Sequence, residues 1–506
     1  LGPHWTSSLE HGVRLTNWAI AWQLLLPADG SSAAPIFDGE EGERFRQLWL
    51  KSVYQHCHFI AGHLSKFSSA NNHLFGEYMG LFIGALNWPL WPQSTGWKAL
   101  AHAGIEEEAL KQIASDGVNR EQALWYQHEV ADMMLLCGLF GRENGVEFSS
   151  AYWKRLETML EFIASVLDAG GNAPSIGDAD DAVMVRFSCE PDFDVYHSLL
   201  ATGAVLFKRG DFKRKAGRFD AKTRWLLGDD VEKEFDTLNV GSTDLPVRRA
   251  FTEGGYYILG GDFETAREVR VVADVAPLGY LSIAAHGHAD ALAFTLSAGG
   301  HPLLIDSGTY SYHTDKMWRD YFRGTSAHNT MRVDGVDQSV SGGNFLWLKH
   351  AAATCEGFEY DAASCYLVGS HDGYMRLPQG VRHRRVWTYD VATRSLRVVD
   401  ALEGSGAHRV EIFWHFAPAC NVELKSDRVT VRSAEVALQL VWPQGLDARL
   451  VHGEDDPPLG WTSSSFDRKT PCTTLVVEGT VKSDSKVGWR GTTELSVAFI
   501  ENRNMQ

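Results

Sequence analysis

The stretch of sequence that decides the fold is GDDVEKEFDTLNVGSTDLP, from Gly228 to Pro246. It is acidic and lacks regular apolar spacing, whereas the chain on either side has a clear period. Before it, apolar residues recur at helical spacing, and after it they alternate with polar residues as in strands. We therefore expect a helical domain over 1–235 and antiparallel β-sheet over 246–506, with 395–400 as the candidate position for a further subdivision.

The helical half shows repeated amphipathic stripes. Leu15, Trp18, Trp22 and Leu25 form one stripe, and another runs from Tyr152 to Val166. Further helices are predicted at 43–62, 72–86, 97–114, 121–139 and 193–208. Consecutive helices joined by short polar loops predict either a bundle or a toroid of helical hairpins.

The second half contains short alternating runs bounded by Gly, Asp, Ser and Pro. Such runs occur at 268–273, 395–399, 429–431 and 436–442. This pattern is typical of antiparallel sheets that pack face to face. The expected fold class is α+β and multidomain, with helices first and β-sandwich domains after them.

Composition excludes some partners. The 506 residues carry a formal net charge of −17, which argues against a general nucleic-acid binder because phosphate neutralisation needs a basic surface. An acidic substrate would need a local basic pocket, for which Arg382–Arg385 is a candidate, although a solvated edge strand explains that run equally well. No stretch approaches the ~20 apolar residues of a membrane helix, so we expect no membrane span.

Side chains that could do chemistry are concentrated in one region. Phosphate-binding glycine loops, zinc-finger spacing and nucleophile elbows do not occur in the sequence. Histidines, an aspartate and tyrosines are instead dense in HGHADALAF (286–294), HPLLIDSGTYSY (301–312) and YFRGTSAHNT (321–330).

His288, Asp306 and His328 are of the types that bind zinc, and three protein ligands with a fourth position for water make a sensible site. Polar residues satisfied near turns are the alternative, with about equal weight. If Gly299 and Gly300 form a two-residue hairpin turn, Asp306 lies opposite about residue 293 and not His288. A bulge or a longer loop would have to bring them together.

The helical half has its own polar cluster in SSANNHLFGEYMGLF, residues 68–82. Asn72 stands where an N-cap belongs, and His73 and Glu77 are four apart, so the carboxylate could orient the imidazole. Taken alone, the segment is better explained as a capped helix with a surface pair. Tyr126 lies on an apolar stripe, and an ordinary core tyrosine is its default interpretation.

Together these segments resemble the heparinase II/III-like family of polysaccharide lyases. The resemblance covers most of the chain, in the family's order and with comparable spacing. The HGHAD and AHNT blocks are its most specific parts. The segments concerned are NNHLFGE (71–77), 116–126, IGDADD (176–181), HGHADALAF, LIDSGTYSY (304–312) and AHNTMRVDG (327–335).

The resemblance implies an incomplete toroid of helical hairpins followed by antiparallel sheet domains. It implies metal ligands at His288, Asp306 and His328. It implies catalytic positions at Asn72, His73, Tyr126 and His286. Glu77, Tyr312, Tyr321 and Arg323 become candidates for substrate contact, each with a structural role as an equal alternative.

The resemblance further implies one divalent metal, usually zinc, although the ligand types leave manganese and calcium open. A structural brace is the more plausible role for it, because fixing His288 also fixes His286. The sequence begins Leu-Gly-Pro without a charged region and an apolar run, so we expect no signal peptide within it. The family resemblance implies a periplasmic or secreted location.

The implied reaction is β-elimination in a uronic-acid-containing polysaccharide, such as a glycosaminoglycan, alginate or an exopolysaccharide. Asn72 and His73 would donate hydrogen bonds to the uronate carboxylate as charge develops on it. Tyr126 would protonate the departing oxygen, and either Tyr126 or His286 would remove the ring proton.

Two other functions stay open. A glycoside hydrolase on a helical toroid would use two carboxylates, for which Asp178, Asp180 and Asp181 are candidates. A non-catalytic polysaccharide-binding protein is disfavoured, because every position that the resemblance assigns to catalysis holds a competent residue type. No motif indicates the oligomeric state.

Overall fold

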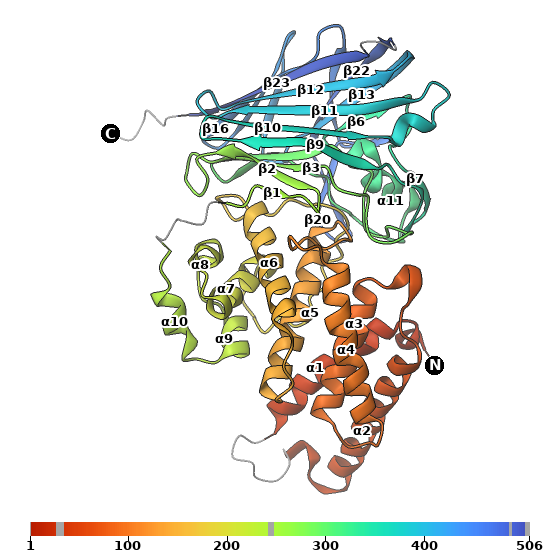
Figure 1. Cartoon of the computed structure of the whole chain (residues 1–506), viewed down its shortest axis with the longest axis vertical. Helices are drawn as coiled ribbons and strands as arrows, with labels where there is room; N and C mark the ends of the chain where they lie inside the picture. Colours follow the sequence, from red (N-terminus) through yellow and green to blue (C-terminus); the bar gives the residue numbers. More distant parts are fainter. Residues whose placement is uncertain (1, 27–34, 241–246, 485–487, 501–506) are drawn as a thin grey trace.

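The computed structural model describes residues 2–26, 35–240, 247–484 and 488–500. It has a helical half and a sheet half. In Figure 1 the helical half lies below and the sheet half lies above. The last helix of the helical half ends at Thr237 and the first strand begins at Ala250. The expected α+β class is confirmed, and the division at 235 and 246 stays a prediction.

The helical half packs its long helices around a core of apolar side chains. Glycine allows the closest crossing: a Cβ added to Gly80 would lie 2.1 Å from Gly12 Cα on the neighbouring helix. The helices are α1 (Ser8–Leu25), α2 (Gly39–Gly62), α3 (Asn72–Asn87), α4 (Ser94–Gln112), α5 (Leu124–Glu143), α6 (Ser150–Val166), α7 (Val195–Phe207), α8 (Gly210–Ala216), α9 (Ala221–Leu227) and α10 (Val231–Thr237).

The helices predicted from apolar spacing are present, with ends that differ by a few residues. The short helix α10 lies inside the acidic stretch 228–246, where no helix was expected, because Phe235 is buried against the other helices. Among the described residues, none of the helices has the length and apolar character that crossing a bilayer requires.

Three antiparallel sheets build most of the second half. The five-stranded sheet contains β1 (Ala250–Phe251), β2 (Tyr256–Gly261), β3 (Val269–Asp274), β4 (Phe294–Ala298) and β5 (His301–Leu304), in that order. The eight-stranded sheet has the order β14 (Asn421–Leu424), β15 (Val429–Ser433), β16 (Val436–Val441), β23 (Trp489–Phe499), β12 (Ser395–Gly404), β11 (Val381–Asp390), β10 (Ser364–His371) and β9 (Ala353–Tyr360). The four-stranded sheet has the order β17 (Asp447–His452), β22 (Thr473–Ser483), β13 (Gly406–His415) and β6 (Met331–Val333).

In the part of this half that the structure describes, three two-stranded ribbons and one α-helix accompany the large sheets. They are β7 (Val340–Gly343) with β8 (Leu346–Lys349), β18 (Glu454–Asp455) with β19 (Pro458–Leu459), β20 (Trp461–Ser465) with β21 (Arg468–Pro471), and α11 (Lys316–Arg323). The β20–β21 ribbon lies at the junction of the two halves in Figure 1.

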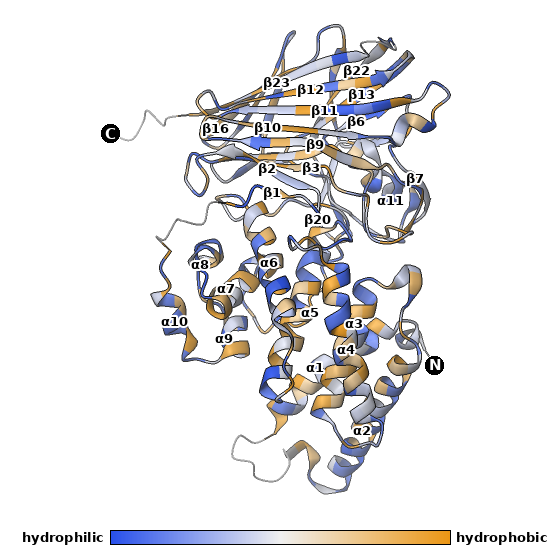
Figure 2. Ribbon diagram, viewed as in Figure 1, coloured by the Kyte–Doolittle hydropathy of each residue, from blue (hydrophilic) through white to orange (hydrophobic). Residues whose placement is uncertain are grey.

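The two halves share apolar packing at their junction. Phe251, Tyr256 and Ile258 of the first sheet belong to the same buried cluster as the helices. The three large sheets enclose a second core, and its strands alternate apolar and polar residues, as Figure 2 shows for the upper half. The site described below lies where the two halves meet.

The basic run Arg382–Arg385 does not lie on an edge strand. It belongs to β11, which pairs with β10 on one side and β12 on the other. His383 and Arg385 point into the core, where both contact Asp400 at 2.7 Å, and Arg384 pairs with exposed Glu356. The strand β12 is likewise paired on both sides, so the sheet continues through 395–400.

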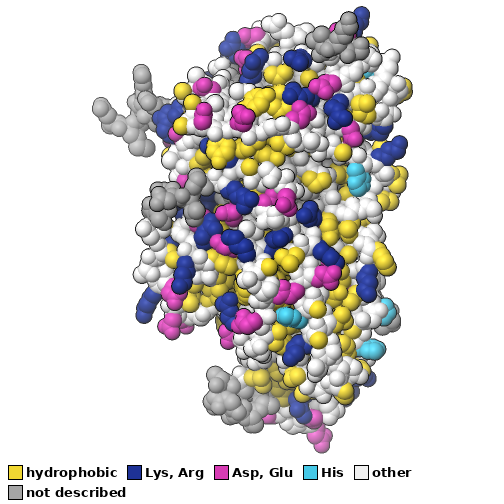
Figure 3. All heavy atoms as spheres, in the orientation of Figure 1, with side chains coloured by type: hydrophobic (Ala, Val, Ile, Leu, Met, Phe, Trp, Pro, Cys, Tyr) yellow, Lys and Arg dark blue, Asp and Glu magenta, His cyan; other side chains and the backbone are white. Residues whose placement is uncertain are grey.

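Acidic and basic side chains are interspersed over the face of the molecule in Figure 3. Neighbouring opposite charges weaken each other's field at a distance. This face therefore offers no extended basic surface of the kind that polyanion binding uses.

Candidate active site and metal centre

Two tyrosines and a histidine from distant parts of the sequence meet at the junction. Tyr126, in the first turn of α5, stacks on His286 with 3.9 Å between ring centroids and 24° between planes. Its hydroxyl lies 3.0 Å from the Tyr312 hydroxyl and donates to Asp180 at 3.2 Å. Tyr126 is buried, as its default interpretation as a core tyrosine predicts, but its hydroxyl also faces other titratable groups.

Asn72 is joined to this cluster through Glu121. The backbone nitrogen and Nδ2 of Asn72 donate to the two carboxylate oxygens of Glu121, at 3.1 and 2.8 Å. Glu121 Oε2 also lies 3.8 Å from His286 Nε2. The N-cap prediction was wrong by one residue: Asn71 caps α3, and Asn72 is the first residue of the helix.

His73 and Glu77 do not pair in the way predicted. Both carboxylate oxygens of Glu77 accept from Ser65, each at 2.6 Å, from its backbone nitrogen and its hydroxyl. Burial raises the pKa of Glu77 to about 7. Burial, and after it the nearby His286, lower the pKa of His73 to about 4, so the imidazole is neutral near pH 7.

One fully buried carboxylate, Asp178, links the two histidines of the HGHAD segment. Its Oδ2 lies 3.1 Å from His286 Nδ1 and its Oδ1 lies 2.9 Å from His288 Nε2. Arg319 of α11 donates to both oxygens, to Oδ2 at 2.6 Å. Burial alone would raise the pKa of Asp178, but Arg319 and the two imidazoles outweigh burial and hold that pKa well below its usual range.

His288, Asp306 and His328 come together as the metal prediction requires. One ligand atom from each lies within 4.8 Å of the others, and all three side chains are buried. The three reach this point from the loop before β4, the loop after β5 and the segment before β6. His328 Nδ1 contacts Asp306 Oδ2 at 2.8 Å.

Two nitrogens of this triad are available to bind a metal. Among the described residues, His288 Nδ1 and His328 Nε2 are buried atoms without a hydrogen-bond partner. An imidazole that faces a carboxylate with one nitrogen and a metal with the other is a common arrangement. The residues present therefore fit a divalent metal.

The two-residue hairpin that was considered at Gly299 and Gly300 is present. Ala298 pairs with His301, and a bulge follows between Leu296 and Ser297. The HGHAD loop itself is held by close backbone packing, because a Cβ added to Gly287 would lie 1.5 Å from the Leu278 carbonyl oxygen. Glycine at this position lets both flanking histidines face Asp178.

Two of the predicted substrate contacts are buried among their own neighbours. Tyr321 packs against Trp318 and Phe322, and Trp461 donates its backbone nitrogen to the Tyr321 hydroxyl at 3.4 Å. Arg323 donates to the Gly343 carbonyl at 2.6 Å and lies over the Trp347 ring. Their roles in substrate binding stay predictions, as does that of Glu77.

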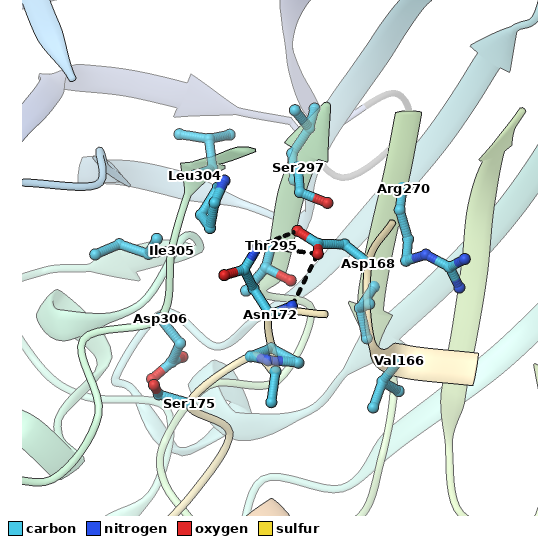
Figure 4. A pocket seen from close by; sticks show the side chains of 15 residues that line it. Val166, Asp168, Asn172, Ser175, Arg270, Thr295, Ser297, Leu304, Ile305 and Asp306 are labelled. Atoms are coloured by element: carbon cyan, nitrogen blue, oxygen red, sulfur yellow. Dashed lines mark hydrogen bonds between the residues drawn. The ribbon is translucent and has the colours of Figure 1, made fainter. Parts of the chain in front are cut away.

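Two cavities lie along the junction. The one in Figure 4, about 80 Å³, has Asp306 at one end and the Asp168–Asn172 pair along its wall, and it is too small for a sugar ring. The other, about 350 Å³, is lined by Trp125, Asp181, Tyr310 and Phe466, among others. Trp125 and Asp181 precede and follow Tyr126 and Asp180 directly in the chain, so the cavity lies close to the tyrosine and histidine cluster.

The β20–β21 ribbon closes this region from the sheet half. Its Phe466 ring packs on Tyr312 with 5.0 Å between centroids, and the Phe466 nitrogen donates to Asp181 at 2.7 Å. The Asp467 nitrogen donates to the Tyr310 carbonyl at 2.7 Å. The ribbon thereby connects the helical and sheet halves beside the tyrosine pair.

Sequence reasoning missed Glu121 and Arg319, and it considered Asp178 only as a hydrolase carboxylate. Glu121 lies in the 116–126 segment already singled out, and its partner Asn72 was a candidate. Arg319 carried no signal, because only the fold brings α11 against residue 178.

Comparisons with known proteins agree with this architecture. Residues 6–190 match the heparinase II/III N-terminus and residues 243–490 match the heparinase II/III-like C-terminal region. A solved heparinase III structure superposes with a TM-score of 0.71 at 18% identity, covering 99% of this chain and 70% of the other. The heparan sulfate lyase HepC from Pedobacter heparinus gives a TM-score of 0.68 at 17% identity, covering 99% and 69%.

The curated relatives are longer than this chain, which aligns with only part of each of them. The heparin-sulfate lyase of Bacteroides thetaiotaomicron is 22% identical over 446 residues, which are 84% of this chain and 57% of that protein. The heparin-sulfate lyase of Pedobacter heparinus is 21% identical over 305 residues, 59% of this chain and 40% of that protein. The chain thus spans only part of the length of these relatives.

Fold and site together define a protein built from a helical toroid and antiparallel sheets, in the arrangement of the solved heparinase III structures. The two family models between them cover most of the sequence. The chain belongs to the heparinase II/III-like family.

Proposed function

We propose that this protein is a polysaccharide lyase that cleaves a uronic-acid-containing polysaccharide by β-elimination. The observation that carries the proposal is the stacking of Tyr126 on His286, with Asn72 joined to the same histidine through Glu121. Three candidate catalytic residues from three segments thus converge on one point. The named relatives, which are heparin-sulfate lyases, support the same class of reaction.

In the proposed mechanism, Asn72 and neutral His73 donate hydrogen bonds to the uronate carboxylate. These bonds stabilise the charge that develops when the proton on the adjacent ring carbon is removed. His286 takes that proton at Nε2, the bond between the neighbouring carbon and the glycosidic oxygen breaks, and a double bond forms between the two carbons. Tyr126 gives its proton to the departing oxygen.

The assignment of Tyr126 as the acid follows from its surroundings. Burial, together with Tyr312 and Asp180, raises the pKa of Tyr126 well above that of a free tyrosine. The hydroxyl therefore keeps its proton near neutral pH and has it available for the leaving group. Hydrogen bonds with Asp180 and Tyr312 hold the hydroxyl in place.

We further propose that His288, Asp306 and His328 hold one divalent metal, with zinc favoured by two imidazoles and one carboxylate. When bound, the metal would supply a fixed positive centre that orders these side chains. The identity of the metal is a proposal. A periplasmic or secreted location is also a proposal, and it is supported by the polymeric substrates that the names of the relatives give.

The 350 Å³ cavity beside the cluster supports a carbohydrate ligand. Aromatic faces, hydroxyls and carboxylates line it, and its size lies at the lower end for small-molecule sites. Trp125 and Tyr310 could stack on a sugar ring there.

The test is a panel of heparan, chondroitin, hyaluronan, alginate and exopolysaccharide substrates, followed by ultraviolet absorbance and product mass. A lyase creates an unsaturated uronate that absorbs, and Tyr126→Phe should lower kcat by about 100- to 10,000-fold. As a matched control, Tyr152→Phe removes another buried hydroxyl, which donates to the Met134 carbonyl at 2.6 Å, and should keep kcat. New reducing ends without absorbance would instead identify a hydrolase.

A further inference from the structure

Asp178 can only be an acceptor toward both histidines. Arg319 is always charged and donates to each of its oxygens, and the carboxylate is fully buried with no exposed surface. An ionised carboxylate has no proton to give. The protons in its contacts with His286 Nδ1 and His288 Nε2 must therefore lie on the imidazoles.

This placement fixes the other nitrogen of each ring. With its proton on Nδ1, His286 has a free lone pair at Nε2, which lies 3.8 Å from Glu121 Oε2. With its proton on Nε2, His288 has a free lone pair at Nδ1, which has no partner among the described residues. One anion thus prepares a base on one side and a metal ligand on the other.

We propose that Asp178, held by Arg319, is a positioning residue that sets the tautomers of His286 and His288 together, so that His286 Nε2 can accept a proton and His288 Nδ1 can bind a divalent metal. The inference rests on the proposed lyase function for its catalytic part only. Its metal-binding part stands apart from any activity.

The decisive variant is Asp178→Asn. An amide keeps the shape but offers one acceptor and one donor, so one of the two histidines must face an N–H group and adopt the opposite tautomer. We expect Zn²⁺ affinity, measured by competition with a chromophoric chelator, to fall 10- to 100-fold, or kcat to fall by about 100-fold with KM within about twofold, or both. Wild-type Zn²⁺ affinity together with wild-type kcat overturns the proposal.

A matched control is Asp132→Asn, which removes the charge of another buried aspartate, paired with Lys222 at 2.7 Å within the helical half. It can lower stability, but it should leave both Zn²⁺ affinity and kcat unchanged. If it changes them as much as Asp178→Asn does, the effect is a general loss of structure and the proposal fails.

A second variant guards against misfolding of the first. Arg319→Lys keeps the positive charge but replaces two parallel hydrogen bonds with one, so Asp178 can turn. A folded Arg319→Lys protein with wild-type zinc affinity and kcat contradicts the proposal, and a loss in either supports it. If no polymer is cleaved at all, the lyase function fails, while the Zn²⁺ titrations still decide the metal-binding part.

Discussion

At the scale of single residues, Glu77 shows how burial changes the pKa of a carboxyl group. It has no exposed surface, and two hydrogen bonds from Ser65 do not offset the loss of water, so its pKa rises from 4.5 to about 7. The folded state therefore keeps a proton that the unfolded state loses above pH 4.5. Stability falls as pH rises through this window, and the loss is complete above about pH 7.

Glu77→Gln should remove this dependence. A pKa shift of about 2.5 units corresponds to roughly 3 kcal/mol. Between pH 4.5 and 8 the wild type should lose about that much of its free energy of unfolding through Glu77, and the variant should not lose this contribution. Urea denaturation at both pH values measures it. Parallel pH profiles for the two proteins would show that the buried carboxyl is not protonated in the native state.

Residue positions were predicted best where a motif carried them. Asn72, Tyr126 and His286 were named from the sequence, and the structure brings them together with His73 nearby. Glu121 and Arg319 could not be found in that way, because their partners lie 49 and 141 positions away in the chain. Local spacing holds no information about such contacts.

At the scale of elements, the first turn of α3 positions two candidate catalytic side chains. The Asn71 side chain accepts a hydrogen bond from the His73 nitrogen at 3.2 Å, and this cap fixes where the helix begins. The same device starts α6, where the Ser149 hydroxyl accepts from the Tyr152 nitrogen at 3.2 Å. The two caps differ in what their first turns carry.

Asn71→Ala should therefore change both stability and KM, whereas Ser149→Ala should change stability alone. Each should cost about 1 kcal/mol of stability in urea denaturation. Only Asn71→Ala should also raise KM for the polymer that the protein cleaves. Without the cap, the first turn of α3 no longer holds Asn72 and His73 in place. A similar KM in both variants would mean that the cap does not position the carboxylate-binding pair.

The spacing of apolar residues predicted the long helices and the alternation of apolar and polar residues along the strands, because both depend on local sequence. It did not predict α10, whose burial of Phe235 depends on its neighbours, or α11, which forms within the dense polar region. The hairpin at Gly299 and a bulge or longer loop near it were both considered from the sequence, but the position of the bulge between Leu296 and Ser297 came only from the structure. Strand order in the large sheet likewise required the structure.

At the scale of the whole molecule, polar contacts join the two halves. Asp116 accepts from the Glu253 and Gly254 nitrogens at 2.8 and 2.9 Å, and the Asn172 side chain donates to the Gly300 carbonyl at 2.9 Å. Arg270 reaches the Ser165 carbonyl at the end of α6. The sequence predicted a boundary between the halves but none of the contacts that cross it.

Asp116→Ala should weaken this junction. It leaves buried backbone donors without partners, which costs about 2–4 kcal/mol, measurable by calorimetry or urea denaturation. Asp361 also accepts from two backbone nitrogens, at Ala363 and Ser364, but in an exposed turn. Asp361→Ala should cost less, since water replaces it, and equal losses would mean that the Asp116 donors also reach water.

The division of the buried network between the halves has a consequence for inheritance. Asn72, Glu121, Tyr126 and Asp178 precede the acidic stretch 228–246, whereas His286, His288 and Arg319 follow it. An exchange of one half between relatives could keep two well-folded parts and still separate every histidine of the HGHAD segment from its carboxylate. Selection on the reaction therefore acts on the pair, and the two halves can be expected to descend as one unit.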